Sequence, residues 1–376
     1  EQLRGENLRL REQRNTLYAF TLCALATVVG LIYVRQILPM LFAQPFNQDF
    51  AQDYVGARAL LSRTDELYPV LDSAFARLGI IWPVHHRSTH PPTAFLFVLP
   101  YVLFHYRWAA ILWMASMFVC MALAARALGL EWRKSALAAM LSLAWPPAIW
   151  SLFQFTPIWL LGLVLAYRFR RNPLASGASI GIAALPKFLA APALLYHFRH
   201  RRWPALIGFG AVWMGALALL LVLRTDFLSA YLSSSDNALS QIRRADNGAL
   251  AVVAWRLGRW AGLGAVAALG SWVVWSGCRR KDWVSWASFV WLGIALLPIA
   301  WVYSLLPLLP WLLLSLKASA TRTRILAAIA LLLPYVVVIP GGVKGWAVAV
   351  CIAFSGLALG TTPEEKGQNA NDCTNQ

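Results

Sequence analysis

The sequence contains few charged residues, and acidic residues are the scarcest of them. Of its 376 residues, 13% are charged and 59% are apolar, whereas a soluble globular domain has about 25% charged and about 45–50% apolar residues. The mean hydropathy of +0.58 therefore excludes a soluble enzyme as well as a disordered or fibrous chain. A helix needs about 20 apolar residues to cross a membrane, so the chain has enough for about ten to twelve crossings.

Cysteine pairs with a recognisable spacing are also absent. The five cysteines are scattered, and the sequence has no CxxC pair or metal-binding spacing, which argues against a disulfide framework. The first apolar run, residues 16–33, lacks a small-residue cleavage site, so we expect it to be retained as a helix rather than removed as a signal peptide.

The charges that are present are strongly unbalanced, with 33 Lys and Arg against 16 Asp and Glu and a net charge of +17. In a soluble protein this excess would indicate nucleic-acid binding. In a membrane protein Lys and Arg collect in cytoplasmic loops, and we adopt this interpretation, with no nucleic-acid partner. The basic residues form clusters at 4–14, 126–134, 168–171, 199–202, 279–281 and 317–324.

The spacing of these clusters predicts the membrane topology. If each cluster is cytoplasmic, an even number of crossings separates it from the next. The apolar stretch from Pro91 to Phe104 is too short to cross, and we assign it as an external half-helix. The result is an all-α polytopic membrane protein with about twelve transmembrane helices and both termini in the cytoplasm.

The domain organisation follows from this topology. We assign residues 1–15 to a charged cytoplasmic segment, residues 16–361 to the transmembrane domain and residues 362–376 to a disordered cytoplasmic tail. Two external loops are expected, a large one at 36–107 that contains short interfacial helices and a smaller one at 224–247. The unusual polar residues converge on the external side, which predicts a single site there. They are Asp49, Asp53, Arg58, His90, Gln154, Lys187, Arg243, Arg244 and Tyr303.

Several of these residues have a functional and a structural interpretation. Asp49 and Asp53 share one face if their segment is helical, where a partly desolvated carboxylate suits a general base; alternatively, Asp49 caps the helix and Asp53 is solvated. Lys187 lies in the middle of an apolar hairpin, where a lysine is costly and typical of a functional site, unless it snorkels to the interface. An ammonium there would suit a lipid-linked phosphate.

The remaining candidate residues also have both a functional and a structural interpretation. His90 precedes two prolines and either binds a phosphate or caps a helix. Gln154 either binds a sugar hydroxyl or lies in a turn, while Trp301 either stacks on a sugar or belongs to the aromatic belt of the membrane interface. The pair Arg243 and Arg244 lies in an external loop, against the orientation rule, and contacts a phosphate unless it is merely solvated.

The order of these motifs resembles glycosyltransferase family 87, the C-type transferases that use polyprenyl-phosphate-mannose. The resemblance covers roughly residues 16–340 and departs from the family pattern at Phe153, where a Gly is usual, and at Val302, where a His is common. It rests on the run Asp-Phe-(x)2-Asp-Tyr-(x)2-Ala-Arg-(x)2-Leu from Asp49, Leu67-Tyr68-Pro69, His90-Pro91-Pro92, Gln154, the Gly-rich helix from Gly177 to Lys187, and Pro298-(x)2-Trp301-(x)-Tyr303.

The resemblance implies a GT-C-type fold and an inverting transfer of a sugar, expected to be mannose, from a polyprenyl-phosphate donor to a glycan or glycolipid acceptor. It places the enzyme in a bacterial-type plasma membrane with its active site on the external face. Asp49 would be the general base, with Asp53 as the second choice. The donor phosphate would contact Lys187, Arg243, Arg244, Arg58 and His90, and the sugar or acceptor would contact Gln154, Trp301, Tyr303 and Tyr54.

Two other functions stay open from the sequence. A polytopic transporter or lipid-linked-sugar flippase would share the many helices and the buried lysine, and a membrane scaffold without catalysis is the least favoured alternative. Two neighbouring Asp side chains could hold a divalent cation, but no complete ligand set is visible, so no cofactor is predicted with certainty and no metal site is assigned.

Overall fold

A computed structural model describes Arg35 and residues 49–62, 65–80, 87–234, 240–244, 247–280, 282–337 and 345–363. The predicted charged segment 1–15, the helix expected at 16–33 and the tail beyond residue 363 lie outside the described residues. The chain divides into two compact units, 1–45 and 46–376, and the elements below all belong to the second.

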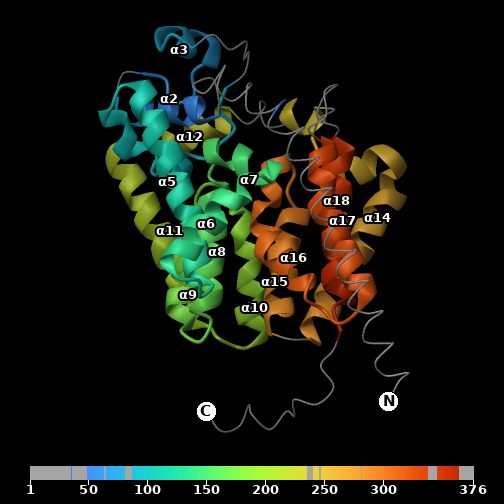
Figure 1. Ribbon diagram of the computed structural model, residues 1–376. Coiled ribbons are helices and arrows are strands. Elements are labelled where there is room, and N and C mark those ends of the chain that lie inside the picture. Colours follow the sequence, from blue (N-terminus) through green and yellow to red (C-terminus); the bar gives the residue numbers. More distant parts are fainter. Residues whose placement is uncertain are drawn as a thin grey trace, which may run out of the picture. The chain divides into compact units, whose positions relative to one another are not determined.

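The described residues form helices and no strands, as the sequence predicts (Figure 1). The first half of the unit contains α2 (Phe50–Leu61), α3 (Leu71–Arg77), α4 (Pro92–Phe95), η1 (Leu99–Leu103), α5 (Tyr106–Ala127), α6 (Trp132–Ser142), α7 (Pro146–Trp150), η2 (Ser151–Phe153), α8 (Thr156–Arg168) and α9 (Pro173–Ala184). The second half contains η3 (Phe188–Ala193), α10 (Leu194–Arg199), α11 (Pro204–Leu223), α12 (Phe227–Ser233), α14 (Leu250–Cys278), α15 (Asp282–Ala295), η4 (Val302–Leu308), α16 (Leu309–Ser315), α17 (Thr321–Val337) and α18 (Gly345–Thr361).

Proline sets where many of these helices begin. Pro173 and Pro204 occupy the first positions of α9 and α11, where the missing amide hydrogen would have had no partner in any case. The side chain of Asn172 accepts a hydrogen bond from the Ala175 amide at 3.2 Å and so caps α9. The starts of these two helices are therefore encoded locally, by proline and, in α9, by the Asn172 side chain.

Three of the described helices, α5, α11 and α14, are long and apolar enough to cross a membrane. A fourth candidate is the pair formed by α6 and residues 146–153, which is bent by 97°. The chain is thus an integral membrane protein. Residues 91–104 form only the short helices α4 and η1, and the predicted count of about twelve crossings stays a prediction.

Helices α9 and α11 pack through glycines so closely that their backbones touch. A Cβ atom on Gly177 would lie 1.9 Å from the Ala205 carbonyl oxygen, and one on Gly208 would lie 2.1 Å from the Leu174 carbonyl oxygen. Small residues permit such close approach of helices inside a membrane, where lipid removes the usual hydrophobic driving force. This glycine contact joins α9 to α11.

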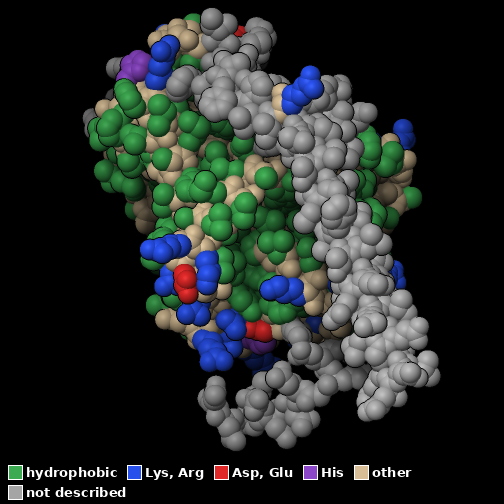
Figure 2. Space-filling model, in the orientation of Figure 1, with side chains coloured by type: hydrophobic (Ala, Val, Ile, Leu, Met, Phe, Trp, Pro, Cys, Tyr) green, Lys and Arg blue, Asp and Glu red, His purple; other side chains and the backbone are tan. Residues whose placement is uncertain are grey.

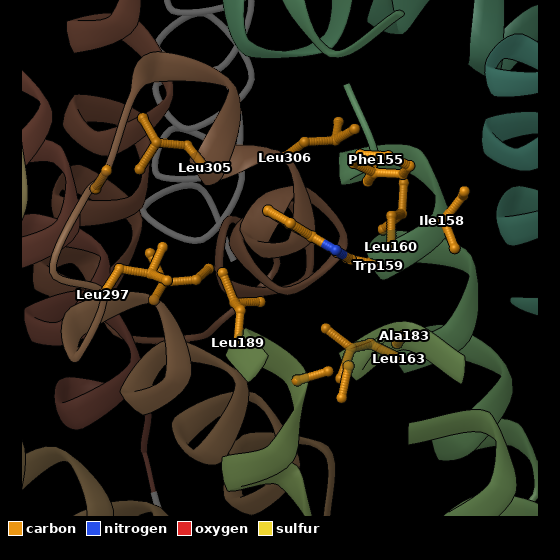
Figure 3. Packing of buried hydrophobic residues seen from close by; sticks show 14 of the residues in the cluster. Phe155, Ile158, Trp159, Leu160, Leu163, Ala183, Leu189, Leu297, Leu305 and Leu306 are labelled. Carbon is orange, nitrogen blue, oxygen red and sulfur yellow. The ribbon is translucent and has the colours of Figure 1, made fainter. Parts of the chain in front are cut away.

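Large side chains fill the interior around α8. Trp159 and Leu163 on α8 pack with Ala183 of α9, Leu189 of η3 and Leu306 of η4 (Figure 3). Packing of this density leaves little room for changes in side-chain volume, so the short helices η3 and η4 are held firmly against α8.

Four of the basic clusters, at 126–134, 168–171, 199–202 and 279–280, gather at one end of the helices, which we call the basic end. Arg202 donates to the Arg170 carbonyl at 2.5 Å, and Arg199 donates to the Ser285 hydroxyl at 2.8 Å, so the turns after α8, α10 and α14 meet. The turn between α5 and α6 lies there too. Helix α5 packs along α8, and Trp113 in the first half of α5 contacts Phe155 directly before α8, so the second half of α5 runs beside α8 toward this end. Which side of the membrane this end faces stays a prediction.

The glycine contact yields a test of the fold. We expect Gly208→Ala to lower stability by about 1–3 kcal/mol, because the added methyl meets backbone that cannot move aside. Gly210→Ala is the matched control on the same helix, since a Cβ there meets open space and alanine favours the helix by about 0.5–1 kcal/mol. Thermal unfolding of both purified variants in detergent gives the comparison, and equal melting temperatures would contradict the packing argument.

Candidate active site

Helix α2 carries both candidate carboxylates at its first turn. Asp49 stands at the N-cap position, but its side chain makes no capping hydrogen bond, so it is not the simple helix cap that the sequence left open. Its carboxylate instead accepts a hydrogen bond from the side-chain amide of Gln154, which comes from the turn between η2 and α8. Asp49 is half-buried, so it is more exposed than Asp53.

Asp53 lies one turn further along α2 and is almost completely buried, with 1% of its surface exposed. Its Oδ1 atom lies 2.6 Å from Nδ1 of His90, which is also buried, while Oδ2 has no hydrogen-bond partner among the described residues. Burial raises the pKa of the Asp53 carboxyl, and the neighbouring His90 and Lys187 act to lower it. Asp53 is therefore not solvated, and it forms a buried pair with His90.

Three contacts fix the position of His90 around this pair. Its carbonyl oxygen accepts a hydrogen bond from the Tyr68 hydroxyl at 2.9 Å, and its ring packs edge-on against Phe155 at a centroid distance of 5.4 Å. Its amide donates to the Ser88 hydroxyl at 3.3 Å. The two prolines that follow His90 begin α4, so the motif His90-Pro91-Pro92 ends the loop and aims the imidazole at α2.

Lys187 supplies the positive charge of the site. It follows α9 in an extended conformation and lies in electrostatic range of both Asp49 and Asp53. Its ammonium is 5.8 Å from the ring centre of Trp159 and 6.0 Å from that of Tyr303, which is cation–π distance. Lys187 is thus directed inward, toward the carboxylates, and does not snorkel away from them.

Arg244 and Trp301 lie at the edge of this group. The Arg244 guanidinium stacks over the Trp301 ring at 5.2 Å, and Arg244 lies in electrostatic range of Tyr303. The structure therefore brings together most of the residues that the sequence singles out. They are Asp49, Asp53, His90, Gln154, Lys187 and Tyr303, with Arg244 and Trp301 beside them.

Three predicted residues are not part of this group. The Tyr54 hydroxyl donates to the Phe104 carbonyl at 2.8 Å, on a different face of α2 from Asp53, and Arg58 lies against that hydroxyl. Arg243 is exposed, and its carbonyl accepts a hydrogen bond from Arg256 at 3.1 Å. Their predicted contacts with donor or acceptor stay predictions.

Two further residues, Trp159 and Thr93, lie near the site, and the sequence did not predict them. Trp159 faces Lys187, and its buried indole nitrogen has no acceptor among the described residues. Thr93 of α4 donates to the Leu185 carbonyl at 2.5 Å and so ties α4 to the turn that holds Lys187. An indole and a hydroxyl inside apolar runs look like ordinary core residues, and no local signal marks them.

Arg224 caps the far end of α2. Its guanidinium donates to the carbonyl oxygens of Ala59 at 2.8 Å, Ser62 at 3.0 Å and Asp65 at 2.7 Å, near the C-terminus of α2, where helix carbonyls lack partners. Asp226 pairs with the same guanidinium, Nε to Oδ1, at 2.7 Å, and these hydrogen bonds lower the pKa of Asp226. A charged pair at the end of α11 thus fixes the helix that carries Asp49 and Asp53.

Asn247 performs a similar task for the turn that carries Trp301. Its side chain is completely buried and donates to the carbonyls of Ile242 at 3.2 Å and Pro298 at 2.9 Å. It accepts from the amides of Ala249 at 3.0 Å and Ala300 at 3.1 Å. With both donors and both lone pairs used, Asn247 ties Ile242 in the segment 240–247 to the turn beside the site.

Comparison with known proteins decides the family. The model of glycosyltransferase family 87 matches residues 89–301, more than half of the chain. The chain belongs to glycosyltransferase family 87. No curated protein matches. A similar solved structure is the crystal structure of ArnT from Cupriavidus metallidurans in the apo state, with 14% identity, a TM-score of 0.36, and coverage of 92% of this chain and 77% of that chain.

The family 87 match includes His90, Gln154, Lys187 and Arg244, so most of the group around the site lies inside it. Asp49 and Asp53 precede the matched range, and their assignment to the site rests on the geometry of α2. Among the described residues, no group of three His, Cys, Asp or Glu is placed to hold a metal ion.

The cap on α2 makes a testable prediction. Arg224→Ala removes three charge-assisted hydrogen bonds and leaves Asp226 without this partner, so we expect the end of α2 to lose about 2 kcal/mol of local stability. Amide hydrogen exchange near Ser62 should then be roughly thirty-fold faster. Arg77→Ala is the control, because Arg77 is an exposed arginine on α3. Unchanged exchange in Arg224→Ala would show that α2 does not depend on this cap.

Proposed function

We propose that the protein transfers mannose from a polyprenyl-phosphate donor to a hydroxyl of a glycan or glycolipid acceptor, with inversion at the anomeric carbon. The observation that carries the proposal is the half-buried carboxylate of Asp49, which Gln154 holds in range of the Lys187 ammonium. A reachable base beside a fixed positive charge is what attack on a phosphate-activated sugar requires.

Asp49 acts as the general base in this proposal. Its carboxylate takes the proton of the acceptor hydroxyl as the hydroxyl oxygen bonds to the anomeric carbon. The bond from that carbon to the phosphate oxygen breaks on the opposite face, and its electron pair leaves with the lipid phosphate. A phosphate leaves without being protonated, so one carboxylate suffices, in contrast to the paired carboxyl groups of glycosidases.

Lys187 and Arg244 bind the donor phosphate. Lys187 lies near the carboxylates and Arg244 lies over Trp301, so the two cations approach the site from different elements. Positive charges fixed in place stabilise the negative charge that develops on the leaving phosphate. Trp301 and Tyr303 then offer aromatic surface to the sugar, and Gln154 orients Asp49.

Asp53 and His90 are assigned an orienting role. Asp53 is almost fully buried, and its Oδ1 atom lies 2.6 Å from Nδ1 of His90. An acceptor hydroxyl therefore reaches Asp49 more easily than Asp53. Asp53 also lies in electrostatic range of Lys187, so the pair helps to hold the ammonium in position until the phosphate arrives.

The proposed orientation sets the site on the external side of the plasma membrane. The basic end then faces the cytoplasm, in agreement with the distribution of Lys and Arg in membrane proteins, and the donor reaches the site sideways from the outer leaflet. Both chain termini are assigned to the cytoplasm, and the fold is assigned to the GT-C type.

Substitution of the base tests the mechanism. We expect Asp49→Asn to lower kcat by about 10²–10⁴-fold, as removal of a general base does, while the amide retains an oxygen for Gln154. Purified protein in detergent would be given polyprenyl-phosphate-mannose and candidate acceptors, and the mannosylated product measured. Glu131→Gln, an exposed change at the basic end, is the matched control and should keep full activity.

Three outcomes would overturn parts of this proposal. Transfer by Asp49→Asn at the wild-type rate would remove Asp49 from the mechanism, and loss only in Asp53→Asn would make Asp53 the base. Movement of the lipid-linked sugar across proteoliposomes by the wild type, with no mannosylated product, would replace the transferase with the flippase.

The phosphate contact has its own test. We expect Lys187→Gln to lower kcat/KM for the donor by roughly a hundredfold or more, because it removes a fixed charge from the leaving group, and Lys187→Arg to recover part of the loss. Lys134→Gln, at an exposed lysine of the basic end, should match the wild type. A donor kcat/KM in Lys187→Gln equal to that of Lys134→Gln would exclude the phosphate role.

A further inference from the structure

Three turns at the basic end form one surface, which we call the basic surface: residues 168–172, 199–203 and 278–280. The first two turns each contain three arginines and the third contains two. The turns are in direct contact through Arg202 and Arg170 at 2.5 Å and through Arg199 and the Cys278 carbonyl. Figure 2 shows Lys and Arg side chains gathered in the lower part of the view, below a face covered by hydrophobic side chains.

Half of these arginines are used to hold the turns together. Arg170 pairs with Asp282 and lies 4.3 Å from the Tyr167 ring centre. Arg199 donates to Ser285, Arg202 donates to the Arg170 carbonyl, and Arg280 donates to the Leu359 carbonyl at 3.0 Å. These four charges therefore have internal partners and make the surface rigid.

The other four arginines have no neutralising partner among the residues that the structure describes. Arg168, Arg171 and Arg201 are exposed, and within the described part of the chain no hydrogen bond or ion pair involves their side chains. Arg279 is also exposed and stacks on Trp275 at 3.9 Å. A rigid frame thus presents several uncompensated guanidinium groups side by side, an arrangement that favours bidentate binding of phosphate.

Exposed aromatic side chains place this surface at the membrane boundary. Phe198 and Trp203 are 41% and 57% exposed and pack edge-on at 5.4 Å. Trp203 stands directly before α11, and Trp275, 54% exposed, lies in the last turn of α14; both helices are candidate spans. Aromatic rings at the ends of spans lie at the level of the lipid headgroups, so the free arginines reach the phosphate layer.

The backbone at Arg201 also departs from ordinary geometry. Arg201 has a φ of 53°, a left-handed conformation that is unfavourable for residues other than Gly, Asn and Asp. A glycine would suit this turn better on backbone grounds. Arginine at this position makes the turn less stable than glycine would, and a residue kept in an unfavourable backbone conformation points to a function of its side chain.

We propose that the basic surface binds the phosphate headgroups of anionic phospholipids in the adjacent leaflet. Arg168, Arg171, Arg201 and Arg279 contact the phosphates, and Phe198, Trp203 and Trp275 pack against the glycerol and upper acyl chains. The paired arginines Arg170, Arg199 and Arg202 keep the surface in shape. This lipid site lies at the opposite end from Asp49 and Lys187 and is independent of the sugar donor.

The experiment measures binding and stabilisation by a defined lipid. Full-length protein in detergent is titrated with dioleoylphosphatidylglycerol or with dioleoylphosphatidylcholine, and the melting temperature and the lipid retained by native mass spectrometry are recorded. We expect phosphatidylglycerol to raise the melting temperature by about 3 °C or more, since a ligand of the native state stabilises it. Phosphatidylcholine should have little effect, and salt should weaken the phosphatidylglycerol effect.

The test variant is Arg168→Gln/Arg171→Gln/Arg201→Asn, in which asparagine suits the left-handed backbone. It should melt like the wild type without lipid and lose the phosphatidylglycerol shift and the retained lipid. The control, Arg126→Gln/Arg133→Gln/Lys134→Gln, removes the same charge from the neighbouring α5–α6 turn and should keep the shift. Equal loss in both variants would mean that net charge alone attracts the lipid, and equal stabilisation by the two lipids would also overturn the proposal.

Discussion

The buried contact between Asp53 and His90 holds the site together. Their side chains meet at 2.6 Å with almost no exposure, and an unpaired carboxylate in such a place would be strongly unfavourable. The contact therefore fixes α2 against the start of α4. From α4, Thr93 reaches the Leu185 carbonyl and positions the turn of Lys187, so one polar pair sets both the carboxylates and the ammonium.

Much of the fold is readable from the sequence because a membrane separates residues by polarity. Apolar runs form helices whose backbone polar groups are satisfied internally, and the basic turns between them converge at one end, as Arg202 and Arg170 demonstrate. The short stretch 91–104 forms α4 and η1, neither of which can span. The breaks within apolar runs, such as the 97° bend after α6, are less readable, because packing against neighbours decides them.

The residues of the site can be predicted in part from the sequence for a related reason. Polar residues in apolar surroundings stand out, and Asp49, His90, Gln154 and Lys187 do meet. Tyr54 follows Asp53 directly in the sequence, yet neighbours on a helix point in different directions, and its hydroxyl contacts Phe104. Arg224 and Asn247 look like ordinary loop residues, since their partners at Ala59 and Pro298 are distant in the sequence.

The glycine contact between α9 and α11 also influences the distance between two charges, Lys187 at the site and Arg224 at the far end of α2. Both helices begin at the basic end; Lys187 of the site follows α9, whereas Arg224, which caps the far end of α2, follows α11. Because Gly177 and Gly208 bring the two backbones into contact, the spacing between the two helices is fixed there. Two glycines that carry no functional group thus help to set the separation between the Lys187 ammonium and the Arg224 guanidinium, although both glycines lie near the basic end.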